Sequence, residues 1–364
     1  MNEVANKFAP TNYPIQIFIF AFRPKMNPFL PLFKSAFVPI LAGFLLVTTG
    51  CKPSSSAPSV DGYPSKTITV ICPWAAGGGT DRLSRFMADQ LQQELGKPGV
   101  VVNRTGGSGA VGHSAGALAK PDGHTITMIT FELSTMHWMG ISDLTWENFE
   151  PVLQMNADAA AIIVRSDAPW KTITEFMDDV RANPGKRTMS GTSTGGAWDL
   201  AMAGFQLSAD IPVGSVRWIP TKGAAPSIVE LLGGHIDAVC CSVPEAISQI
   251  EARQLRTLAV MSEERLVEYP DMPTVKEAGV DWVAVGWRGL GMPKGTPDKI
   301  LTKVRDACDR IVSSEAYEKG QDQESKIYIP ERKGTVSREP QEKLLSLLST
   351  KTGNSSGQEA IMSI

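Results

Sequence analysis

The feature that most constrains this chain is a run of three glycines between a strand pattern and a helix pattern. Residues 68–72 alternate in the manner of a short buried strand, and Pro73 then ends any sheet ladder. From Leu83 to Leu95 apolar residues recur every three to four positions, which is typical of an amphipathic helix. Gly96 is placed for a left-handed helix C-cap. The glycines must therefore form the turn from strand to helix.

Gly77, Gly78 and Gly79 suit an anion site at the start of that helix. Glycine has no Cβ, so a ligand can approach the backbone closely. The first turn of a helix has N–H groups without partners and carries roughly half a positive charge. A simple strand–helix turn is the alternative interpretation. Thr80 and Asp81 have an alternative role as well, since either can cap the helix.

A second strand, polar loop and helix recur in the same order later in the chain. A strand pattern leads into Ser190, the loop Gly191–Gly196 follows, and a helix pattern begins after it. Strands alternating with helices predict an α/β fold with a mainly parallel sheet. The other predicted strands are 100–103, 124–130, 159–164, 216–220, 236–241 and 255–261, and the other predicted helices end near Lys120 and cover 173–182 and 224–232. Two such loops facing one another would suit a small anion held in a cleft.

The N-terminal part of the chain has the pattern of a targeting segment. Lys34 precedes an uncharged apolar run over 36–47, which is short for a membrane span and typical of a signal-peptide core. The run ends at Cys51 in a sequence that resembles a bacterial lipoprotein processing site. We expect residues 1–50 to be a targeting segment, with Met26 as a possible true start, and 51–62 to be a lipidated cysteine and flexible tether. The alternative is a buried N-terminal helix with an incidental cysteine.

Composition excludes several classes of partner and site. A net charge of −3 over 364 residues gives no sign of a nucleic-acid or anionic-membrane partner. Apart from Cys51 there are four cysteines, and the neighbours Cys240 and Cys241 would form a strained bridge, so we expect core thiols instead of a disulfide framework. The histidines have no metal-ligand spacing. We therefore expect no metal and no cofactor.

Two motifs offer enzymatic alternatives. Gly107–Gly112 fits a dinucleotide fingerprint, with Glu132 twenty residues beyond it, but it follows the second strand instead of the first. Gly191–Gly195 fits the G-x-S-x-G elbow of a serine hydrolase with Ser193 as nucleophile. His235 is the only histidine after Ser193, which leaves little chain for the rest of a hydrolase sheet. An exported serine hydrolase remains the alternative function. Lys222 is either a cation near the cleft or a solvated loop lysine.

With these residues assembled, the chain from about Tyr63 to Gly320 resembles the tripartite tricarboxylate transporter substrate-binding family, also called the Bug family of periplasmic receptors. The stretches that carry this resemblance are 63–66, 73–81, 103–104, 121–125, 182–186, 191–196, 222–226, 230–237, 255–260 and 271–275. Each is weak alone, and their order and spacing make the set specific. From about Gln321 onward the family pattern fades, so we expect residues 321–364 to be a divergent, poorly ordered tail.

The resemblance implies an α/β fold like that of type II periplasmic binding proteins, with two lobes around a ligand cleft. Lobe 1 would comprise 63–160 plus 283–320, and lobe 2 would comprise 161–282. The implied function is that of a monomeric, non-enzymatic periplasmic receptor, which captures a small di- or tricarboxylate and delivers it to membrane permease subunits. Membrane contact would be through the lipid anchor only.

The same resemblance, with the glycine run, predicts the ligand-binding residues. In the first lobe these are Trp74, Ala76, Gly77, Gly78, Gly79, Thr80 and Asp81, and opposite them are Thr192, Ser193, Thr194, Gly195 and, more weakly, Ser242. Binding would rest on backbone donors in place of an arginine clamp. Glu132 is unusual beside a site for an anion, and it would suit a ligand that carries an amine.

Overall fold

A computed structural model describes residues 62–314 and 317 of the chain. Its elements, in chain order, are β1 (Ile68–Cys72), α1 (Gly79–Leu95), β2 (Gly99–Asn103), α2 (Ala110–Ala117), β3 (Thr125–Thr130), η1 (Phe131–Ser134), η2 (Trp146–Asn148), β4 (Phe149–Arg165), α3 (Ile173–Ala182), β5 (Arg187–Ser190), α4 (Ala197–Ser208), β6 (Val216–Trp218), α5 (Ala224–Leu232), β7 (Ala238–Ser242), α6 (Val243–Glu251), β8 (Leu255–Val260), η3 (Lys276–Ala278), β9 (Val285–Pro293) and α7 (Asp298–Val312). Cys51 and the predicted targeting segment, tether and tail lie outside the described residues, apart from Gly62 at the end of the tether.

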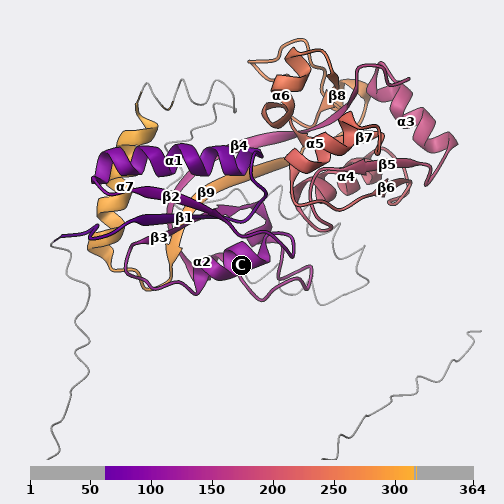
Figure 1. The fold of residues 1–364 in the computed structure, drawn as a ribbon. Helices are drawn as coiled ribbons and strands as arrows, with labels where there is room; N and C mark the ends of the chain where they lie inside the picture. Colours follow the sequence, from indigo (N-terminus) through magenta and orange to yellow (C-terminus); the bar gives the residue numbers. More distant parts are fainter. Residues whose placement is uncertain (1–61, 315–316, 318–364) are drawn as a thin grey trace, which may run out of the picture. The chain divides into compact units, whose positions relative to one another are not determined.

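The strands of the described chain form a nine-stranded mixed sheet in the order β2-β1-β3-β9-β4-β7-β5-β6, with β8 also paired to β4. Strand β4 is shared between two sections of this sheet. Over Phe149–Ala159 it pairs with β9, and from Ala160 onward it pairs with β7 and β8. We call β1, β2, β3, β9 and their helices α1, α2 and α7 the first section. The second section holds β5–β8 and α3–α6 (Figure 1).

The prediction of a mainly parallel sheet was only partly right. Strand β1 is parallel to β2 and β3, and β5 is parallel to β6 and β7, but every pairing of β4 and β9 is antiparallel. We predicted only the last part of β4 and did not predict β9. Glycines weaken the strand pattern of β9, yet close approach requires one of them, because a Cβ on Gly289 would lie 2.7 Å from the carbonyl oxygen of Leu153.

Each section has its own hydrophobic core. In the first section α1 and α2 lie on opposite faces of β1–β3 (Figure 1), and its core includes Met87, Leu91, Ile126, Leu290 and Val304. The core of the second section includes Ile162, Phe176, Phe205, Val239 and Leu258. Cys72, Cys240, Cys241 and Cys308 are free and buried, which confirms the prediction of core thiols. None of the described helices is long and apolar enough to span a bilayer.

Local signals at the glycine run were read correctly. Helix α1 starts at Gly79 within the run and ends before Gly96, which has a φ of 70° and donates its N–H to the carbonyl of Gln92. Helix α3 covers Ile173–Ala182 as predicted. Periodicity and capping residues therefore fix these helices in the sequence, and they place the start of α1 directly after β1.

A substitution at Ile162 tests how far the stability of the protein depends on the core of the second section. Ile162 is fully buried near the C-terminal end of β4. We expect Ile162→Ala to lower the free energy of unfolding by about 2–5 kcal/mol, because it leaves a cavity between strand and helices. Chemical denaturation would measure this, with Val229→Ala, at a position 65% exposed on α5, as the control. Equal losses in the two variants would contradict the packing described above.

Candidate functional site

One cavity lies where the two sections meet, and three helices with glycine N-caps begin at it. Its lining includes Gly79 and Thr80 of α1, Ala197 and Trp198 of α4, and Ala224, Ala225 and Pro226 of α5. The N-caps of the three helices are Gly78, Gly196 and Gly223, and none of these has a side chain to cap its helix. Helix N-termini carry partial positive charge, so their convergence favours an anion. The cavity volume is about 40 Å³, which is room for roughly three waters.

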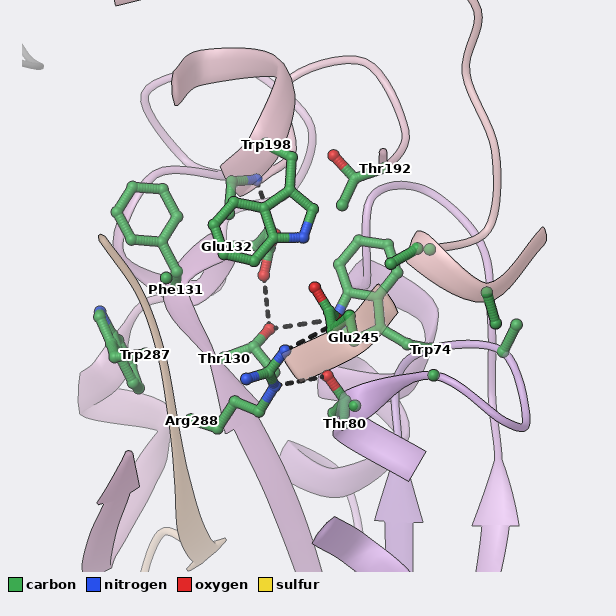
Figure 2. A pocket seen from close by; sticks show the side chains of 18 of the residues that line it. Trp74, Thr80, Thr130, Phe131, Glu132, Thr192, Trp198, Glu245, Trp287 and Arg288 are labelled. Atoms are coloured by element: carbon green, nitrogen blue, oxygen red, sulfur yellow. Dashed lines mark hydrogen bonds and ion pairs between the residues drawn. The ribbon is translucent and has the colours of Figure 1, made fainter. Parts of the chain in front are cut away.

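Aromatic rings and a few polar side chains form the walls (Figure 2). The aromatic residues are Trp74, Phe131, Trp198 and Trp287, and the polar ones are Thr80, Thr130, Glu132, Thr192, Glu245 and Arg288. The indole nitrogen of Trp287 is buried and has no hydrogen-bond acceptor among the described residues. The site therefore combines apolar walls with a small number of directed hydrogen-bonding groups, as small-molecule sites generally do.

The structure brings five of the predicted ligand-binding residues to the cavity and leaves the other seven out of its lining. Trp74, Gly78, Gly79, Thr80 and Thr192 line the cavity, while Ala76, Gly77, Asp81, Ser193, Thr194, Gly195 and Ser242 do not. Several of the second group hold the loops in shape. The hydroxyl of Ser193 donates to the carbonyl of Thr221 (2.9 Å), the carbonyl of Thr194 accepts from Ser108 (2.7 Å), and Ser242 is the N-cap of α6.

Asp81 organises the glycine turn. It is 2% exposed, and its carboxylate accepts hydrogen bonds from the backbone N–H of Gly77 (2.9 Å) and from Asn103 (2.8 Å). It also pairs with Arg85 at 2.9 Å. Burial alone would raise the pKa of Asp81, but these hydrogen bonds hold it below its ordinary value. The carboxylate thus stabilises the turn while the amides at the start of α1 stay uncapped.

The second loop repeats this arrangement. Gly195 donates its N–H to the carboxylate of Asp199 at 2.8 Å, just as Gly77 does to Asp81. Gly77 and Gly195 have φ of 83° and 77°, a region that favours glycine. The N-caps that follow have φ, ψ of −80°, 170° and −78°, 169°. The sequence predicted that the strand, loop and helix recur, but we missed the shared aspartate in the pattern G-G-x-x-D at 77–81 and 195–199.

Arg288 of β9 joins three elements at the floor of the cavity. Its guanidinium pairs with Asp158 of β4 at 2.6 Å. It also pairs with Glu245 of α6 (3.0 Å) and donates to the hydroxyl of Thr80 of α1 (3.0 Å) (Figure 2). The arginine and both carboxylates are buried. Glycine at position 79 leaves room for this ion pair, because a Cβ there would lie 3.0 Å from Glu245 and 3.1 Å from Arg288. We did not predict Arg288 or Glu245, since neither lies in a recognisable loop motif.

Glu132 links the first section to the start of α4 in the second. Its side chain is buried, and one carboxylate oxygen accepts from the backbone N–H of Ala197 at 2.8 Å. The other oxygen accepts from the hydroxyl of Thr130 at 2.5 Å, and Trp74 donates to that same hydroxyl at 3.3 Å. Burial raises the pKa of Glu132. The first backbone N–H of α4 therefore already donates to a carboxyl group of the chain itself.

The enzymatic motifs have structural roles here. His235, the only histidine after Ser193, lies on the surface with its side chain 70% exposed and pairs with Glu230. The Ser193 hydroxyl donates to a backbone carbonyl, so nothing in this arrangement supports the hydrolase alternative. In the Gly107–Gly112 motif, a Cβ on Gly112 would lie 2.5 Å from Pro73, so this glycine lets α2 pack against the end of β1.

The aspartate of the first loop gives a pH-dependent prediction. We expect Asp81→Asn to lower the free energy of unfolding by about 1–3 kcal/mol at neutral pH, because it weakens hydrogen bonds to a charged group. The pKa of Asp81 is lower in the folded than in the unfolded protein, so this contribution is present above the unfolded value of about 4. It is lost as the pH falls through the folded value.

Urea unfolding of parent and variant at a series of pH values would measure this difference. The exposed Asp89→Asn on the same helix serves as control. A gap between parent and Asp81→Asn that stays constant from neutral to acidic pH would show that the carboxylate does not hold the turn through its charge.

The chain is similar to several known proteins. Residues 83–334 match the family described as the tripartite tricarboxylate transporter family receptor. The protein BugT of Bordetella pertussis is 30% identical over 281 residues, which cover 75% of this chain and 84% of BugT. A solved TctC solute-binding protein from Polaromonas, without ligand, is 38% identical, with a TM-score of 0.53 and coverage of 72% of this chain and 89% of that one.

The periplasmic binding protein BugD is 26% identical, with a TM-score of 0.71 and coverage of 80% of this chain and 99% of BugD. This likeness confirms the predicted α/β fold of a periplasmic binding protein. The family consists of periplasmic solute receptors that work with components of a tripartite transporter. From the match over most of its described length and its relatives, we conclude that the chain belongs to the tripartite tricarboxylate transporter receptor family.

Proposed function

We propose that this protein is a receptor that captures a small carboxylate between two lobes and delivers it to the permease subunits of a tripartite transporter. The observation that carries this proposal is the convergence of three helix N-termini, from both sections of the sheet, on one cavity. The first amides of α1 and α5 would donate to a ligand carboxylate. Membership of the family supports the same function.

Capture would require the lobes to part and close. We infer that lobe 1 comprises 63–160 and 283–320, and lobe 2 comprises 161–282. Contacts now join them across the cavity, including Ala75 N–H to the carbonyl of Lys222 (3.1 Å) and Ser108 to Thr194 (2.7 Å). A cavity of about 40 Å³ is small for a carboxylate with several carbons, so entry needs these contacts to open. Strands β4 and β9, which run from one lobe to the other, would act as the hinge.

We infer further that the protein is not an enzyme. Backbone amides, tryptophan rings and one neutralised arginine can bind and orient an anion. They supply no activated nucleophile, and Ser193 donates its hydroxyl to a carbonyl outside the cavity. Affinity would come from directed donors and lobe closure.

A variant at the glycine run tests the anion site. Gly78 has an ordinary φ of −80°, and a Cβ there would lie 3.7 Å from the carbonyl oxygen of Ala75 and 3.9 Å from Ala225. Gly78→Val should therefore fold, while its side chain fills the space between α1 and α5. We expect the parent to gain about 2.7 kcal/mol of stability at a ligand concentration a hundred times Kd, and the variant to gain almost none.

Thermal unfolding with a panel of carboxylates would measure this gain, with Ala182→Val at an exposed position of α3 as the matched control. If no carboxylate stabilises the parent, the receptor proposal fails. If Gly78→Val responds as strongly as the parent, the amides of α1 are not the anion site.

We also propose that the protein is a monomer, exported by residues 1–50 and anchored through a lipid on Cys51. The signal-like pattern and the cysteine after it support this, together with the periplasmic role of the family. In a bacterial host, we expect the parent to incorporate labelled fatty acid and to sediment with membranes. Cys51→Ser should be unlabelled and released into the periplasm. A parent that takes up no label would overturn the anchor.

A further inference from the structure

Glu132 changes which ligands the proposed site can take, and this inference rests on the proposed receptor function. Three helices begin at the cavity, each with roughly half a positive charge at its N-terminus. The carboxyl of Glu132 already accepts from the first amide of α4. Helix α6 also begins near the cavity, but Ser242 and Glu245 form a capping box at its start. The starts of α1 and α5 therefore remain for the ligand, and their combined charge of roughly one unit matches a single carboxylate.

Burial raises the pKa of Glu132, but the hydrogen bonds that its carboxylate accepts from Thr130 and Ala197 oppose this shift and favour the ionised form. Trp74 donates its indole N–H to the Thr130 hydroxyl, so that hydroxyl has its own proton to donate to Glu132. The second carboxylate oxygen accepts from the N–H of Ala197. Both oxygens therefore act as acceptors, which is the behaviour of the charged form. Figure 2 shows this chain from Trp74 through Thr130 to Glu132, beside Trp198.

Among the described residues that line the cavity, none offers a second anion an uncompensated counterion. Arg288 is the lining residue with a positive side chain, and it is paired with both Asp158 and Glu245. Together with Glu132, these side chains carry more negative than positive charge. A ligand with two or three carboxylates would place like charges against Glu132 in a buried site, where such repulsion is costly. A ligand ammonium at the same place would instead pair with Glu132.

We propose that Glu132 is the specificity-determining residue of this receptor, and that it selects a carboxylate bearing a protonated amine over a dicarboxylate of similar length. The ligand carboxylate would lie at the starts of α1 and α5. Its ammonium would lie at the carboxyl of Glu132, which lines the cavity from the opposite lobe to α4. The side chain thus both accepts a hydrogen bond from the start of α4 and pairs with the ammonium end of the ligand.

Matched pairs of ligands test this with the full chain purified in detergent. Succinate, glutarate and adipate are compared by calorimetry with 3-aminopropanoate, 4-aminobutanoate and 5-aminopentanoate, in which an ammonium replaces one carboxylate. For the best-fitting length we expect the amino acid to bind the parent at least about tenfold more tightly than its dicarboxylate partner. Since this comparison needs no variant, it tests the proposal even if substitutions at Glu132 impair folding.

Glu132→Gln keeps an oxygen for the N–H of Ala197 and removes the charge. We expect it to weaken binding of the amino acid at least about tenfold and to strengthen binding of the dicarboxylate. The exposed Glu230→Gln should change neither. A parent that prefers dicarboxylates, or a preference unchanged in Glu132→Gln, would overturn the role of Glu132 while the receptor function stands. A parent that binds neither kind of carboxylate would contradict the receptor function itself.

Discussion

The site depends on one local constraint, which is that helices meeting at the cavity must begin without a side-chain cap. Glycine N-caps leave the first amides of α1, α4 and α5 available to a partner outside the helix. In two of the three, an aspartate one turn into the helix accepts from the glycine before the cap. The aspartate carboxylate therefore stabilises the turn, and the first amides of the helix remain directed at the cavity.

The second constraint is the antiparallel pair β4 and β9. Strand β4 belongs to both hydrophobic cores, and Arg288 on β9 contacts residues of α1, β4 and α6. A movement of the two sections relative to one another would have to change the geometry of these two strands and of the buried ion pairs of Arg288. Breaking a buried pair leaves an uncompensated charge, so the network favours a few discrete arrangements over a continuous range.

Much of the fold was predictable from sequence because its helices and most of its strands have local signals. The α1 region shows this, with a strand pattern, a glycine turn, helical periodicity and Gly96 as C-cap. Strand β9 was not predictable in this way, since its glycines allow close packing against β4, which is distant in sequence. The same limit applies to the site. Thr80 and Thr192 follow from the loops, but Arg288 and Glu245 reach the cavity only through tertiary packing.

The four described cysteines have a consequence for how the chain reaches its native state. A thiolate is the reactive form in thiol–disulfide exchange, and burial raises the pKa of the Cys240, Cys241 and Cys308 thiols, that of Cys308 to about 12. Once folded, these sulfurs are inert even in an oxidising compartment. The unfolded chain has no such protection, and adjacent Cys240 and Cys241 would be exposed together. Folding pairs β7 with β4 and buries both cysteines, so the native state itself keeps these two thiols from wrong oxidation.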